Sequence, residues 1–155
     1  MDLKHALVLL LSGVVGTVGF SLLFRVRKKL VVWAMLGAAL TLGVYVLCVA
    51  TMQQPFFQNL FPALAGALYA EITAKLTKSP ATQYLACAII PLVPGGGLYY
   101  TMSAFVTGEM DTFHTQLAQT ARVAAGLAVG IILVSVLMHQ LRRRSYRALA
   151  QDTDE

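Results

Sequence analysis

Long apolar runs separated by short polar or charged turns make up almost the whole chain. The runs cover residues 5–24, 30–50, 56–76, 81–107 and 117–141. An α-helix of ~20 residues spans the ~30 Å hydrocarbon core of a bilayer. The pattern therefore predicts an all-α integral membrane protein, in which five transmembrane helices form one domain over residues 1–155. The polar residues 108–116 are expected to form a loop, and residues 142–155 a cytoplasmic tail.

The fourth run is broken in its middle by the sequence Pro-x-x-Pro-Gly-Gly-Gly at 91–97. Proline removes a backbone donor and three glycines weaken a helix, so this span is predicted to be interrupted. In hydrocarbon every freed backbone group must find a partner, and interrupted spans of this kind form binding sites in secondary transporters. The free N–H groups of the second half-helix carry partial positive charge and suit a carboxylate.

The break and the residues after it are therefore the predicted substrate-binding site. It comprises Pro91, Pro94, Gly95, Gly96, Gly97, Tyr99, Tyr100 and Thr101. The glycines would offer backbone N–H groups, and the last three residues would offer hydroxyls. The alternative is a simple proline kink packed against a neighbouring helix, with the tyrosines anchoring the membrane interface.

Glu71 is the only acidic residue inside any of the apolar runs. Placing an ionisable residue within a membrane span costs free energy, and such residues are often functional. Glu71 is therefore a candidate for proton or substrate handling. The alternative is an ion pair with Lys75, one helical turn further on and close to the membrane interface.

Basic residues cluster at the ends of the runs rather than on one surface, which argues against nucleic-acid binding despite the net charge of +5. Cytoplasmic loops are enriched in Lys and Arg. With the amino terminus outside and the carboxyl terminus in the cytoplasm, only Lys4 and Arg122 fall on the outer side. The inner side then holds Arg25, Arg27, Lys28, Lys29, Lys75, Lys78, Arg142, Arg143, Arg144 and Arg147. A multi-pass protein of the cell membrane is expected.

Two sets of glycines predict close helix packing. Gly13, Gly16 and Gly19 make a smooth stripe on the first run, and Gly126 and Gly130 form a small-xxx-small pair on the last.

No residue pattern for catalysis is present. The three histidines lie far apart in sequence, and Cys48 and Cys87 match no metal or redox spacing. The glycine run lacks the lysine of a phosphate-binding loop. An enzyme, a metal site and a cofactor are therefore not expected.

The sequence PLVPGGGLYYTM at 91–102 resembles the signature of the threonine/serine exporter family, specifically its smaller, carboxyl-terminal type of module. The similarity extends over nearly the whole chain. It includes the Gly19-Phe20 pair with the arginine-rich turn after it, 33–37, Ala70-Glu71-Ile72, 78–82 and the small-residue last span.

The resemblance implies a half-transporter that works with a larger module of the same family, in one chain or two. Such exporters carry threonine and serine, and a two-chain version carries succinate, so a small carboxylate substrate and coupling to the proton motive force are implied. Two alternatives remain open. The chain could be a structural or assembly subunit that only scaffolds its partner, or a self-sufficient homo-oligomeric channel.

Overall fold

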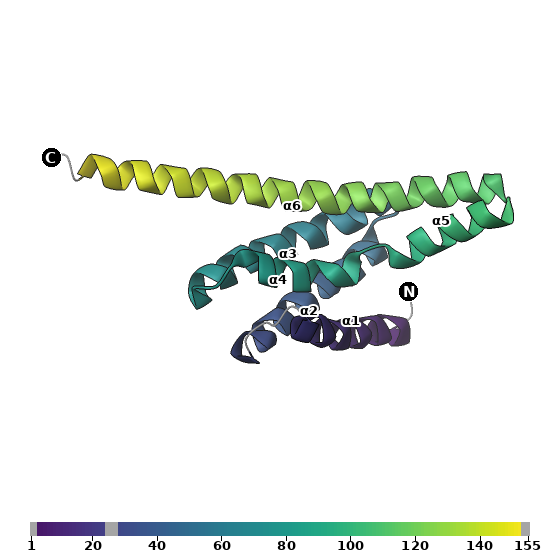
Figure 1. Ribbon diagram of the computed structural model, residues 1–155, viewed down its shortest axis with the longest axis horizontal. Coiled ribbons are helices and arrows are strands. Elements are labelled where there is room, and N and C mark those ends of the chain that lie inside the picture. The colour runs from purple at the N-terminus through teal and green to yellow at the C-terminus, as the bar shows by residue number, and fades with distance from the viewer. Residues whose placement is uncertain (1–2, 24–27, 153–155) are drawn as a thin grey trace.

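The computed structural model describes residues 3–23 and 28–152, which form α-helices joined by short turns (Figure 1). In chain order the elements are α1 (Leu3–Leu23), α2 (Lys28–Thr51), α3 (Pro55–Thr77), α4 (Ala81–Ile89), the short 3-10 helix η1 (Ile90–Leu92), α5 (Gly95–Thr107) and α6 (Met110–Asp152). No strand occurs within these ranges. The predicted all-α class is confirmed.

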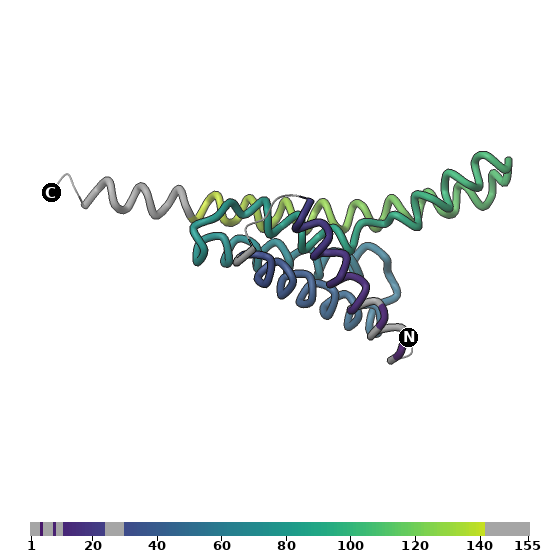
Figure 2. Tube along the Cα trace, turned by 60° about the horizontal axis from the view of Figure 1, so that its bottom comes forward, coloured from purple at the N-terminus to yellow at the C-terminus, as the bar shows by residue number. Residues whose placement is uncertain are grey.

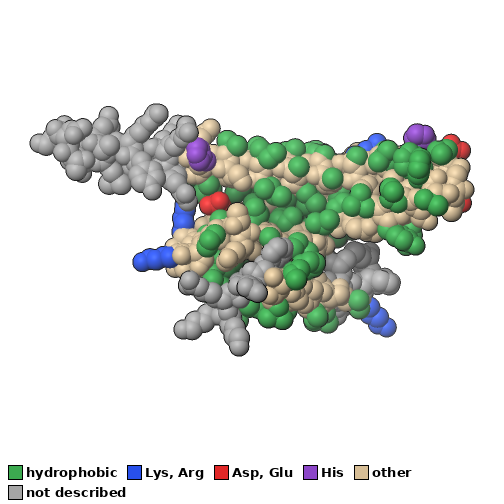
Figure 3. Space-filling model, viewed as in Figure 1, with side chains coloured by type: hydrophobic (Ala, Val, Ile, Leu, Met, Phe, Trp, Pro, Cys, Tyr) green, Lys and Arg blue, Asp and Glu red, His purple; other side chains and the backbone are tan. Residues whose placement is uncertain are grey.

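The helices run back and forth between two ends of the molecule (Figure 1). The start of α1, the α2–α3 turn and the α5–α6 turn lie at one end, whereas the α3–α4 turn lies at the other. On the face drawn in Figure 3, charged side chains gather toward these two ends and hydrophobic side chains cover the region between them. Large apolar side chains in that region are exposed, as Val15 is at 69% and Ile132 at 58%. A hydrocarbon environment explains this exposure.

Within the described residues, Leu30–Thr51 and Met110–Leu141 are each long and apolar enough to cross a membrane. The bent pair Ala81–Leu92 and Gly95–Thr107 adds a third span if it is counted as one, and Leu11–Leu23 is a shorter apolar helix. The chain is therefore a membrane protein. The number of five spans stays a prediction.

The closest helix packing joins α6 to α3. A β-carbon on Gly126 would collide with the backbone carbonyl of Phe56, and one on Gly130 would lie 2.9 Å from the carbonyl of Leu60. Both glycines therefore allow the two backbones to meet, and the packing predicted for this pair is confirmed. In the other stripe only a β-carbon on Gly13 would meet neighbours, the side chains of Leu42 on α2 and of Pro91 on η1.

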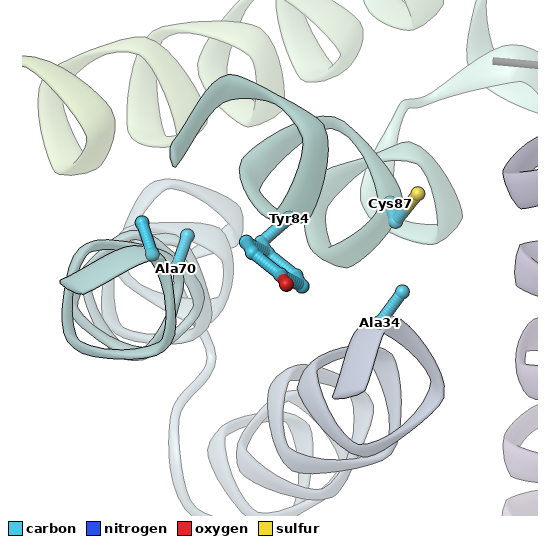
Figure 4. Close-up of a cluster of buried hydrophobic side chains, with 5 residues drawn as sticks. Ala34, Ala70, Tyr84 and Cys87 are labelled. Atoms are coloured by element: carbon cyan, nitrogen blue, oxygen red, sulfur yellow. The ribbon is translucent and has the colours of Figure 1, made fainter. Parts of the chain in front are cut away.

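A second centre of packing lies where α2, α3 and α4 meet (Figure 4). Ala34 and Ala70 bring the helices close together, and the ring of Tyr84, only 1% exposed, fills the space between them with Cys87 beside it. The Tyr84 hydroxyl donates a hydrogen bond of 2.9 Å to Thr77 Oγ1, so its polar end is also satisfied.

The loop predicted for 108–116 is wrong. Gly108, at φ 79°, closes α5, and the N–H of Glu109 donates to the Ala104 carbonyl at 3.0 Å, which leaves α6 free to begin at Met110. Glycine adopts this left-handed conformation without a steric penalty. The ring of Phe113 packs on Phe105 with centroids 5.4 Å apart, so this polar segment is held as a helix by contact with α5.

The last helix, α6, continues without interruption to Asp152, so most of the predicted tail at 142–155 is helical, and its place in the cytoplasm stays a prediction. Arg25 and Arg27 of the first basic cluster lie outside the described residues, as do residues 153–155. For the second cluster, at 142–147, the structure describes the helical backbone and not the side chains.

Candidate functional site

The interruption in the fourth predicted span is a bend of 51° between the α4–η1 segment and α5. It begins about halfway along α3, because the Ile89 side chain lies next to Gly66 in the middle of that helix. From this bend α5 leaves the bundle and runs beside the first part of α6 (Figure 2).

Each proline leaves one backbone carbonyl without its helical donor. Pro91 has no N–H for the carbonyl of Cys87, four residues earlier, and the Thr17 hydroxyl of α1, which donates to the Gly13 carbonyl at 2.8 Å, comes within 3.5 Å of it. Pro94 likewise leaves the Ile90 carbonyl free, and this carbonyl accepts the N–H of Val93 at 3.1 Å. The break is therefore supported by its surroundings, as a break inside a membrane must be.

The first turn of α5 does present unused donors. The Gly95 N–H donates to the Val93 carbonyl at 2.7 Å, and helical bonding begins with the N–H of Leu98. Between them, the N–H groups of Gly96 and Gly97 have no acceptor in the part of the chain that the structure describes. Two donors at the positive end of a helix dipole form an environment that favours an anion.

These donors belong to the wall of a cavity of about 520 Å³. This volume lies in the range of ~300–1,000 Å³ that is typical of small-molecule sites. Residues from α1, α2, α3, η1, α5 and α6 line it, and none of those described is charged. They include Gly13, Gly16, Tyr45, Asn59, Gln116, Gln119 and Thr120, together with the whole stretch 90–97.

Asn59 is the most deeply placed polar side chain of this wall, with an exposed fraction of 4%. Its amide nitrogen donates to the Pro55 carbonyl at 2.8 Å. Its side-chain oxygen has no hydrogen-bond partner among the described residues. Every described side-chain oxygen that is fully shut off from solvent does have a hydrogen-bond partner, so the Asn59 oxygen is not fully shut off. The oxygen therefore opens to the cavity and is available as an acceptor.

The structure brings some of the predicted site residues together and leaves others apart. Pro91, Pro94 and the three glycines at 95–97 all lie on the cavity wall. The side chains of Tyr99 and Tyr100 do not, since they are 69% and 61% exposed on α5. The hydroxyl of Thr101 is buried and donates to the Gly97 carbonyl at 2.7 Å, so it is already used.

Sequence reasoning missed the polar residues that face the break from other helices. Gln116, Gln119 and Thr120 are spaced three and four apart and share one face of α6. Because a loop was expected up to residue 116, this helical face was not predicted. Asn59 carried a usable signal, because an uncompensated amide inside an apolar span is costly unless it serves a purpose.

Glu71 lies elsewhere. With Lys75, Ser135, Met138 and His139 it lines a smaller hollow of about 140 Å³ between α3 and α6, which shares no residue with the main cavity. The Lys75 ammonium lies 4.0 Å from the sulfur of Met138 and, among the described side chains, forms no ion pair with Glu71. A role for Glu71 in proton or substrate handling stays a prediction. No three His, Cys, Asp or Glu side chains in the described ranges are grouped to hold a metal ion.

A known protein family matches most of this chain. The family model described as Threonine/Serine exporter, ThrE, matches residues 9–137, a range that contains every residue of the cavity wall. Comparisons with curated proteins and with solved structures find no match. The match extends over most of the chain, and the apolar helices fit a membrane transporter. The chain therefore belongs to the threonine/serine exporter family.

Proposed function

We propose that this chain is one module of a membrane exporter of small amino acids and that the cavity at the break binds the substrate. The observation that carries the proposal is the pair of free N–H groups at Gly96 and Gly97, two residues that line a cavity with no charged residue among its described wall residues. The α-carboxylate of the substrate accepts hydrogen bonds from these groups, as anions do at helix N-termini. Charge-assisted bonds of this kind are about twice as strong as neutral ones.

The absence of charge among the described wall residues favours a zwitterion over a dicarboxylate. A dicarboxylate brings two negative charges out of water, and with no Lys or Arg to pair with them the desolvation cost is high. An amino acid carries no net charge. Its carboxylate fits the start of α5, and its ammonium group fits the side-chain oxygen of Asn59, the buried acceptor of the same cavity. The family description names threonine and serine.

The proposed mechanism is alternating access between this chain and a larger partner module of the same family. With the amino terminus outside, α5 starts partway across the membrane and runs outward, so its positive end faces the cytoplasm. This orientation suits loading of the substrate from inside. The partner closes the site and supplies the proton pathway, because the cavity wall described here contains no carboxylate.

An efflux assay tests the function directly. Cells preloaded with labelled threonine, serine and succinate express this chain alone, the larger module alone, or both. Efflux of threonine and serine only with both modules is the expected result. Preferential efflux of succinate would contradict the zwitterion assignment.

A scaffold that supports its partner without binding substrate is the second candidate. The sparse embedded charge favours it, since Glu71 is the one acidic residue in the predicted spans and lies away from the cavity. In the same assay, full efflux from the larger module alone would favour the scaffold. Efflux from this chain alone would favour a homo-oligomeric channel.

The orientation is testable by cysteine labelling. Thr112→Cys lies on the exposed first part of α6, and Thr82→Cys lies at the opposite end of the molecule. An impermeant thiol reagent should label the first in intact cells and the second only after permeabilisation. The native Cys48 and Cys87 are buried and provide an unreactive background. The reverse labelling pattern would invert the proposed topology.

A further inference from the structure

Thr120 on α6 differs from three other buried threonines of the bundle in the state of its hydroxyl. Thr17, Thr41 and Thr101 each donate to the carbonyl four residues earlier, at 2.7–2.8 Å. This local bond is the usual way in which a helix satisfies a buried hydroxyl. Thr120 is just as buried, with an exposed fraction of 7%, but its hydroxyl has no hydrogen-bond partner within the described ranges.

The unused hydroxyl opens to the cavity. Within the described ranges, every side-chain oxygen that is shut off from solvent has a partner, so the Thr120 oxygen must reach open space, and Thr120 is part of the cavity wall. It also lies against the first turn of α5. A β-carbon built on Gly97 would be 2.6 Å from this oxygen, so only glycine lets the two approach. The hydroxyl is therefore adjacent to the free N–H groups that the proposed function assigns to the carboxylate.

We infer that Thr120 is a specificity-determining residue of this cavity and that its hydroxyl hydrogen-bonds the side-chain hydroxyl of a bound threonine or serine. The inference rests on the proposed function. In these amino acids the hydroxyl is carried by the β-carbon, two bonds from the carboxylate carbon. A site that holds both groups needs its two sets of partners side by side, as Gly97 and Thr120 are.

The same hydroxyl disfavours substrates without one. If alanine or 2-aminobutyrate filled the site, the buried Thr120 oxygen would be left unpaired and also shielded from water. Sites built to bond a hydroxyl reject analogues that lack it for this reason. A preference of about tenfold for threonine over 2-aminobutyrate follows from one such bond.

A competition binding assay tests the inference. It uses the chain over residues 1–155, purified with its partner module if efflux requires that module. Labelled L-threonine is displaced by unlabelled L-threonine or L-2-aminobutyrate, and the readout is the ratio of the two dissociation constants. The wild type should prefer threonine about tenfold. Thr120→Val should bring the ratio close to one by weakening threonine alone. Thr120→Ala should do the same without crowding Gly97, and Thr120→Ser should keep the preference.

Thr115→Val is the matched control, because it removes a hydroxyl from the same helix that is bonded to the Asp111 carbonyl at 2.9 Å. Its ratio should equal that of the wild type. If Thr120→Val and Thr120→Ala both keep the preference for threonine while Gly96→Leu abolishes binding, the role of Thr120 is wrong and the proposed function stands. If the wild type binds neither amino acid, both are wrong.

Discussion

Gly126→Leu is expected to prevent the chain from accumulating as a folded membrane domain. Even a β-carbon at this position would overlap the carbonyl of Phe56, with the backbone nitrogen of Leu60 only 3.3 Å away. Backbone atoms cannot rotate aside as a side chain can, so the leucine must push α6 off α3. Overpacking a well-packed contact costs about 1–3 kcal/mol, and a clash with backbone lies at or above the top of this range.

Thermal unfolding of the detergent-solubilised protein measures this effect, together with its yield in membranes. The melting temperature should fall by more than about 10 °C, or no folded protein should be recovered. Gly43→Leu is the control, because a β-carbon there meets nothing within 4 Å. It adds the same side chain to a membrane helix and should unfold like the wild type. Equal stability of the two variants would contradict the α3–α6 packing described above.

The sequence was informative wherever a physical constraint acts on neighbouring residues. Hydrophobic length predicted the main helices, and the Pro91 to Gly97 stretch predicted the break, since its residues change backbone chemistry directly. The glycine pair on α6 predicted a close approach, although not its partner, α3. Each of these features is local, so it can be recognised without knowing the fold.

Features that depend on contacts between distant segments could not be predicted. Thr17 approaches the Cys87 carbonyl, which Pro91 leaves without a helical donor, from a helix seventy residues earlier in the chain. Thr120 faces Gly97 only because α5 and α6 form a hairpin, and the start of α6 is helical because Phe113 packs on α5. Composition alone made that segment look like a loop. The sequence therefore did not predict the polar residue Gln116 of this segment as part of the site, whereas it did predict Tyr99 and Tyr100, which are exposed.

The break at 91–97 is held by contacts with its surroundings and also lines the cavity. The carbonyl of Ile90 accepts the N–H of Val93, and Thr17 lies within 3.5 Å of the carbonyl of Cys87, while the N–H groups of Gly96 and Gly97 have no acceptor among the described residues. The surrounding protein thus holds an interrupted helix in place without using the two groups that the interruption exposes.

Gly96→Leu should abolish export and leave the protein folded in the membrane. A β-carbon at Gly96 meets nothing within 4 Å, and the residue lies on the cavity wall. The leucine side chain is therefore expected to occupy part of the cavity and to cover the N–H groups proposed to hold the carboxylate. Leucine also has a higher helix propensity than glycine, by less than about 1 kcal/mol, so the melting temperature should be unchanged or higher.

Export and stability are therefore expected to separate at this position, in contrast to Gly126, where the same substitution is expected to prevent folding. Efflux of labelled threonine from cells that express the variant with the partner module should fall to the level of cells without this chain. Gly96→Ala adds a single methyl group and should retain part of the activity. Gly43→Leu again serves as control, because it lies outside the cavity and should export normally. Undiminished export by Gly96→Leu, with protein present in the membrane, would mean that the start of α5 does not bind the substrate.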